Sequence, residues 1–177
     1  MVDNVNLGRD SHFNHVIDVA KTTTGRGKVA DQQRVAPGIH LSVDMDAKVS
    51  GSFESGAGRL ISVNYTSETA PKWVALHINL GEVSLEDKAV LGIVVRSTAK
   101  EAVAMRVCLR SGTQNFVDEF FTKHIVAFSE PSTHLDILKL DDLPAHHPRG
   151  KVERDLIVFF PPTDSAFTIS DIRLFIA

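Results

Sequence analysis

The 177-residue chain is poor in several residue types, and each shortage excludes a class of protein. It contains one cysteine, one tryptophan and one tyrosine, and its formal net charge is −3. A single cysteine excludes an intramolecular disulfide framework. An acidic balance without a lysine and arginine cluster gives no reason to expect nucleic acid or an anionic membrane as a partner.

Targeting and membrane-spanning segments are also missing from the sequence. The N-terminal stretch MVDNVNLGRDSHFNHVIDVAK has no basic segment followed by an apolar core, so it does not predict a signal peptide. No window approaches the length and hydrophobicity of a membrane span. We therefore expect a cytoplasmic protein.

Sequence patterns typical of enzymes are absent. The chain has no G-x-S-x-G, no glycine-rich phosphate loop and no H-E-x-x-H. His77, His124 and His134 lack the spacing of a cupin metal site. Asp118, Glu119 and Glu153 could supply a carboxylate pair for glycoside hydrolysis, but no feature singles them out. A binding protein is therefore favoured over an enzyme.

The stretch from Lys72 to Arg110 is the clearest structural signal, and it predicts three consecutive strands. Residues 73–80 and 103–110 each alternate apolar with polar or small side chains. Each predicted strand therefore has one face toward the core and one face that carries the polar side chains. The segment AVLGIVV between them is apolar on both faces, which is typical of a strand covered on both sides.

The rest of the chain repeats this style, with strands about every dozen residues and turn signals between them. This spacing predicts an all-β fold, an antiparallel two-sheet β-sandwich, over residues 38–177. Residues 1–37 are interpreted as a partly irregular N-terminal extension that lies over the sandwich, in which HFNHVIDVAK could form a helical turn or a short strand.

Several short patterns in residues 38–177 resemble the galactose-binding-like jelly rolls used as carbohydrate-binding modules. They are W-V-A-L-H-I-N-L, L-G-I-V-V-R, M-R-V-C-L-R, T-H-L-D-I-L-K-L-D-D-L-P and F-T-I-S-D-I-R-L. They are also similar to the domain of the complex I intermediate-associated protein family, which serves in assembly. The chain departs from the pattern at His134, where the modules have an aromatic residue.

The resemblance implies a strand order in which RLISVNY is the second strand. Residues 72–80, 102–110, the Phe116 segment and 154–160 would then share one sheet. The predicted ligand-binding residues on its concave face are Trp73, His77, Asn79, Arg106 and Arg110, with Asp118 or Glu119 nearby. Aromatic faces and planar polar groups of this kind suit sugar recognition, and a carbohydrate is therefore the expected ligand.

Each of these residues also has a purely structural interpretation. Trp73 could cover the sheet, His77 could be a satisfied sheet histidine, and the two arginines could be cross-strand ion-pair partners. An aromatic content of 7% is low for a binder that relies on stacking. The alternative function is an intracellular protein-interaction or assembly module, with a protein partner and an oligomeric state that the sequence does not specify.

No organic cofactor is expected, but the resemblance implies a structural calcium ion between Glu54 and Asp171. The alternative is an exposed turn carboxylate and an aspartate at a strand end. Calcium needs several oxygen ligands, and two carboxylates with backbone carbonyls could supply them. The pairs His12/His15 and His146/His147 lack the further ligands of a zinc site. Cys108 lies inside a predicted strand and is interpreted as a buried structural thiol.

Overall fold

A computed structural model describes residues 10–177, with side chains from residue 14 onward. Within these residues, helix α1 (Asp10–Thr22) precedes thirteen strands in two antiparallel sheets. The first sheet has the order β1 (Gly25–Lys28), β4 (Ser50–Gly56), β5 (Arg59–Thr66), β13 (Ser165–Ile176), β7 (Val90–Ala99) and β11 (Ser132–Lys139).

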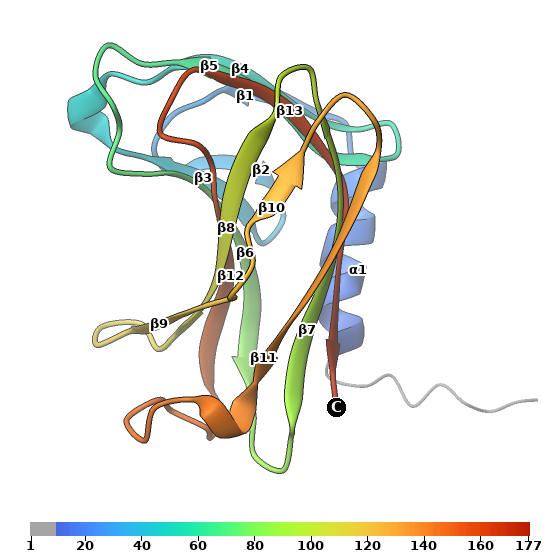
Figure 1. Cartoon of the computed structure of the whole chain (residues 1–177), viewed down its shortest axis with the longest axis vertical. Helices are drawn as coiled ribbons and strands as arrows, with labels where there is room; N and C mark the ends of the chain where they lie inside the picture. Colours follow the sequence, from blue (N-terminus) through green and yellow to red (C-terminus); the bar gives the residue numbers. More distant parts are fainter. Residues whose placement is uncertain (1–9) are drawn as a thin grey trace, which may run out of the picture.

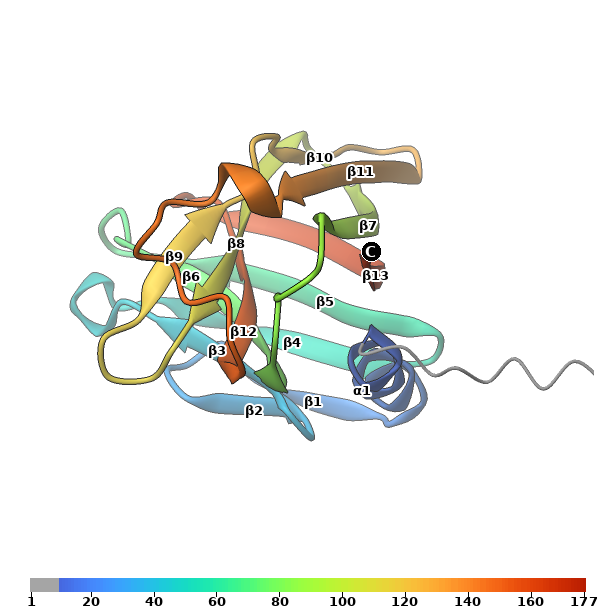
Figure 2. The same ribbon diagram turned by 90° about the horizontal axis from the view of Figure 1, so that it is seen from below.

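The second sheet has the order β10 (Ile125–Ala127), β8 (Val103–Ser111), β12 (Val152–Phe159), β6 (Val74–Val83), β3 (Ile39–Val43) and β2 (Gln33–Ala36). Strand β9 (Val117–Phe120) pairs with β8, and short 3-10 turns occur at Met45–Ala47 and Leu140–Asp142. Figures 1 and 2 show the two sheets as facing layers. The predicted two-sheet antiparallel sandwich is confirmed.

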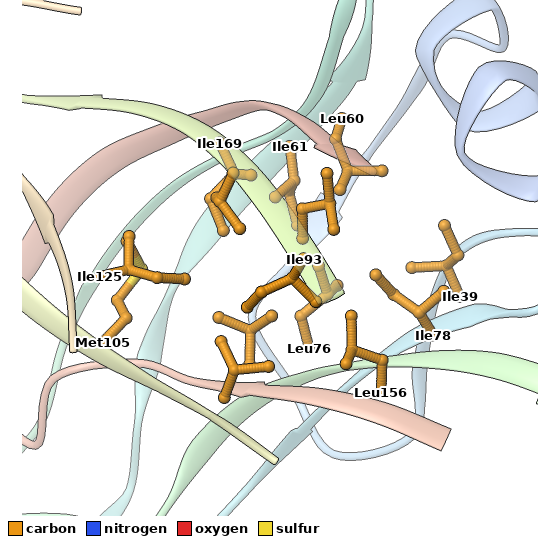
Figure 3. Close-up of a cluster of buried hydrophobic side chains, with 14 of the residues drawn as sticks. Ile39, Leu60, Ile61, Leu76, Ile78, Ile93, Met105, Ile125, Leu156 and Ile169 are labelled. Atoms are coloured by element: carbon orange, nitrogen blue, oxygen red, sulfur yellow. The ribbon is translucent and has the colours of Figure 1, made fainter. Parts of the chain in front are cut away.

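The core lies between the sheets and is built by the side-chain alternation seen in the sequence. Ile61, Ile93 and Ile169 from the first sheet meet Leu76 and Leu156 from the second, and all five are fully buried (Figure 3). Burial of each such side chain contributes about 1.5–3 kcal/mol. Because these residues occupy one face of each strand, the opposite faces are free for other roles.

Residues 25–36, assigned from the sequence to an irregular extension, instead form strands of both sheets. Strand β1 pairs with β4, and β2 pairs with β3. The Pro37-Gly38 pair is the turn that joins β2 to β3, and Gly38 has the positive φ of +71° that glycine tolerates without strain. The sequence interpretation took TTTGRGK as a loop and placed the start of the β-structure at Gly38.

Helix α1 takes the place of a neighbouring strand along part of β13. Strand β5 pairs with β13 only from Ser165 to Ile169, and the amide of Asn14 then bonds both the N–H and the C=O of Leu174. Ile17 and Ala20 enter the core from the helix. Figure 1 shows α1 beside β13, on the side of the molecule opposite β9. Of the helical segments in residues 10–177, none has the length and apolar character needed to cross a membrane.

Candidate functional site

The outer face of the second sheet, which we call the groove face, carries most of the chemically informative side chains. Cross-strand register arranges them in three rows. The rows are Ser42–Ala75–Phe159–Arg106, then His40–His77–Ile157–Cys108–Phe120, then Asn79–Asp155–Arg110–Asp118. The strands that were predicted to share a sheet therefore do so, and their polar faces are neighbours.

The floor of the groove face is apolar and fully buried. Ala75, Cys108 and Ile157 are fully buried beneath the rings of Phe120 and Phe159, whose centroids are 5.8 Å apart. Burial raises the pKa of the Cys108 thiol to about 12, so the thiol stays protonated and unreactive at neutral pH. Cys108 is thus the buried structural thiol that its place in a strand predicted.

A cavity of about 540 Å³, which we call the aromatic cavity, lies on this face. Its lining residues are Asp31, Gln32, Ser42, Lys72, Trp73, His77, Arg110, Phe116 and Phe159. Trp73 is the residue just before β6 and is 40% exposed. Phe116 lies in the loop between β8 and β9 and is 49% exposed. Three rings from separate parts of the chain therefore meet around one hollow.

His77 forms the polar part of the aromatic cavity. Its Nε2 lies 2.9 Å from the Ser42 hydroxyl, and its ring stacks on His40 with centroids 4.6 Å apart. Burial, with the nearby charges of His40 and Arg110, lowers the pKa of His77 to about 4. The imidazole is therefore neutral at physiological pH and can exchange hydrogen bonds with a ligand without adding charge.

Arg110 is held by two neighbours. Its Nε and Nη2 each donate to a different oxygen of Asp118 at 2.7 Å, and its guanidinium lies 3.8 Å from the centroid of the Phe116 ring. Bidentate pairing fixes the plane of the guanidinium as well as its charge. Arg106 lies 4.0 Å above Phe120 and forms no ion pair with the residues that the structure describes.

A second cavity of about 650 Å³, which we call the acidic cavity, adjoins the first. It is lined by Asn79, Arg110, Gly112, Thr113, Phe116, Glu153, Arg154 and Asp155. The Asn79 amide nitrogen donates to Asp155 at 3.1 Å, and its oxygen accepts from the N–H of Gly81 at 3.0 Å. Burial raises the pKa of Asp155, and the Asn79 hydrogen bond opposes that shift.

Four of the five residues predicted to bind ligand border these two cavities. Trp73 and His77 line the aromatic cavity, Asn79 lines the acidic cavity, and Arg110 lines both. Arg106 lies on the same face but borders neither. Ligand binding by these residues stays a prediction, because their positions do not test it.

Sequence reasoning missed Phe116, Phe159, Ser42 and Asp155. Phe159 stands two residues after Ile157 on the same side of its strand, so alternation within β12 was a usable signal. The contribution of Phe116 carried no such signal, because its position depends on a loop and on stacking against Arg110.

The predicted calcium residues lie on the first sheet, and each is paired with cations. Glu54 lies 2.7 Å from Arg59, and Asp171 lies 3.1 Å from both Lys21 and Arg173. The described part of the chain contains no cluster of three or more histidine, cysteine or acidic side chains suited to a metal. Calcium at Glu54 and Asp171 stays a prediction; of the histidine pairs, the side chain of His12 lies outside the described residues.

Comparison with known proteins gives a fold and no sequence family. No family model matches the chain, and no curated protein matches it. A solved family 4 carbohydrate-binding module aligns with a TM-score of 0.59 at 9% identity, over 91% of this chain and 99% of that module. A family 11 module from Clostridium thermocellum, solved with a β-1,3-1,4-mixed-linked tetrasaccharide, aligns with a TM-score of 0.50 at 15% identity, over 87% and 97%.

These alignments confirm that the chain has the jelly-roll fold of carbohydrate-binding modules. Identities of 9% and 15% carry the fold alone. The narrower galactose-binding-like assignment, and the relation to the complex I assembly domain, stay predictions.

Proposed function

We propose that this chain is a non-catalytic domain that binds carbohydrate through the groove face. The observation that supports this most directly is the aromatic cavity, in which the rings of Trp73, Phe116 and Phe159 surround neutral His77. Aromatic rings offer apolar faces to the C–H surfaces of a pyranose, and the polar groups between them pair with its hydroxyls.

The electrostatics of the aromatic cavity agree with an uncharged ligand. Its two cations have their own carboxylates, Asp118 for Arg110 at 2.7 Å and Asp46 for Lys72 at 3.6 Å. The remaining carboxylate, Asp31, accepts the N–H of Val43 at 3.2 Å. Among the described residues Asp31 has no cationic partner, so the cavity carries no surplus positive charge that would call for an anionic ligand. Sugars bind through directed hydrogen bonds and ring contacts, and the Asp31 carboxylate can accept a hydroxyl.

The test is binding of soluble β-glucans and of a glycan array to the purified chain, comparing Trp73→Ala with Phe128→Ala. Phe128 is a matched control, since it is an aromatic residue of similar exposure, 43%, outside both cavities. We expect saturable binding that Trp73→Ala weakens about tenfold or more and Phe128→Ala leaves unchanged. Absence of binding to every glycan by the folded chain would refute the proposal.

Protein interaction is a second candidate, favoured by a separate set of exposed apolar side chains. Val126, Phe128, Leu135 and Ile137 lie on or between β10 and β11 and are 36–55% exposed. Exposed apolar side chains on neighbouring segments can mark a protein contact. Replacing Leu135 and Ile137 by serine should then reduce self-association or partner binding, measured by sedimentation velocity. If the variant and the parent chain sediment alike, alone and with each partner tested, the exposed apolar residues no longer support this function.

A further inference from the structure

We infer that the groove face is divided into two unequal sugar subsites, and that the second of them selects a neutral sugar over a uronate. This inference rests on the proposed carbohydrate-binding function. The divider is the pair Arg110–Phe116, and the second subsite is the acidic cavity.

The divider is visible in the linings of the two cavities. Arg110 and Phe116 are the residues that both linings share. The guanidinium stacks on the ring at 3.8 Å, and Asp118 holds the guanidinium from a second direction. A ring supported in this way loses little freedom when a ligand packs against it, which favours binding. Asp118 is thus a positioning residue, outside both cavity linings.

The two cavities offer different chemistry to adjacent units of a ligand. The aromatic cavity presents three rings and suits the face of a pyranose. The acidic cavity presents Asn79, Thr113, Glu153 and Asp155 around a single ring, Phe116. Carboxylates accept hydrogen bonds and donate none while ionised, so this cavity suits the hydroxyl groups of a second unit.

Charge in the acidic cavity disfavours an anionic unit. Glu153 and Asp155 are two residues apart on one strand, and the nearby charge of Glu153 adds to the burial that raises the pKa of Asp155. The lining also contains two cations, Arg110 and Arg154, and Asp118 pairs with Arg110. The three carboxylates Glu153, Asp155 and Asp118 therefore outnumber the two cations by one. The guanidinium of Arg154 is buried and donates to Ser111 and to the carbonyls of Val83 and Pro148.

The sizes of the cavities fit separate occupancy. Volumes of about 540 and 650 Å³ both fall within the range of roughly 300–1,000 Å³ that is usual for small-molecule sites. A monosaccharide would occupy part of one cavity at a time, whereas a longer chain could reach both. Affinity should therefore rise with chain length.

The experiment is isothermal titration of the full chain with glucose, cellobiose, the mixed-linked β-1,3-1,4 tetrasaccharide and tetragalacturonate. We expect the tetrasaccharide to bind at least about tenfold more tightly than glucose and tetragalacturonate to bind more weakly than the neutral chain. Glu153→Gln should narrow the preference for the neutral chain over tetragalacturonate. Glu130→Gln, which removes the same charge from an exposed loop position, should not.

Asn79→Ala tests the division itself. It should weaken tetrasaccharide binding about tenfold and leave glucose binding unchanged, while Phe116→Ala should weaken both. Thr113→Val supplies a milder change at an exposed position should Asn79→Ala unfold. Equal affinity for glucose and tetrasaccharide, or equal binding of tetragalacturonate, would overturn this inference alone. Failure of all four probes to bind would also overturn this inference, and the proposed function would fall with it only if the folded chain binds no glycan on the array either.

Discussion

Two parts of the sandwich lack a further strand or sheet against them among the described residues, and they are covered differently. One is the side of β13 beyond Ile169, where the pairing with β5 has ended, and the other is the groove face. Along β13, helix α1 supplies Asn14 to Leu174 and places Ile17 and Ala20 in the core. On the groove face, individual side chains cover the apolar floor, among them Phe120 and Phe159.

The difference shows how one part of a sandwich can contribute stability while another part leaves room for a ligand. Helix α1 covers its part of the sheet with one continuous element whose side chains enter the core. Individual side chains of unequal length cover the floor but leave spaces between them, and two of those spaces are the aromatic and acidic cavities. We expect stability to depend on α1 and on the buried contacts, and binding to depend on the groove face.

The largest expected loss of stability comes from Arg154→Met, which would undermine the groove-face sheet from its buried side. Arg154 is 1% exposed and donates to carbonyls of Val83, Pro148 and Gly150 without a carboxylate partner. The free energy of unfolding should fall by about 3 kcal/mol, because the acceptors are left unsatisfied. Denaturant unfolding measures this.

Arg106→Met is the matched control for that change, since Arg106 is exposed and lies over Phe120 without an ion pair to a described residue. Its unfolding free energy should stay within about 0.5 kcal/mol of the parent. Equal losses from the two variants would contradict the role given to the buried guanidinium.

The packing of helix α1 against the core is tested by a second substitution. Ile17→Ala should lower the free energy of unfolding by about 2–4 kcal/mol, because Ile17 is fully buried between α1 and the core. The exposed neighbour His15 provides the control variant His15→Ala. Glycan affinity of the folded Ile17→Ala chain should be unchanged, and a parallel loss of affinity would show that the two regions are coupled.

Acid should weaken the groove face through His77. Its pKa is lowered to about 4 in the folded chain from an ordinary value of 6.5, so the unfolded chain binds the proton first. The stabilisation is present above pH 6.5 and is lost as the pH falls toward 4, with a magnitude of about 3 kcal/mol.

The measurement is the unfolding free energy at several pH values for the parent and for His77→Gln. The slope between pH 4 and 6.5 should be shallower in the variant, because one titrating group has been removed. Identical slopes would contradict the assignment, whatever the contribution of the other histidines.

The smallest expected effect is that of the ion pair between α1 and β13. Asp18 Oδ1 lies 2.5 Å from Arg173 Nη2, and the side chain of Asp18 is 54% exposed. Asp18→Asn should cost about 0.2–1 kcal/mol, and the difference should shrink in high salt. A loss as large as that from Ile17→Ala would mean that charge, and not burial, holds the helix.

Much of the groove face could be predicted because strand alternation is local. Trp73, His77 and Asn79 were placed together from their spacing, as were Arg106 and Arg110. The short strands β1 and β2 could not be predicted in this way. Their sequences GRGK and QRVA carry little apolar periodicity, and they become strands through pairing with β4 and β3.

The pairing of distant residues was equally out of reach. Asn79 meets Asp155 from 76 positions away, and Ser42 meets His77 from 35. The loop between β8 and β9 brings Phe116 against Arg110, which makes one ring part of both cavities.

The sequence by itself determined which side of each strand faces the core, because side chains alternate with a period of two whatever the neighbours are. It thereby determined the two-sheet sandwich and the polar character of the groove face. Only the tertiary structure decided which strands became neighbours, where α1 replaced a strand, and where hollows remained between covering side chains. Those outcomes depend on non-local packing, in which residues far apart in the chain must fit one another in space.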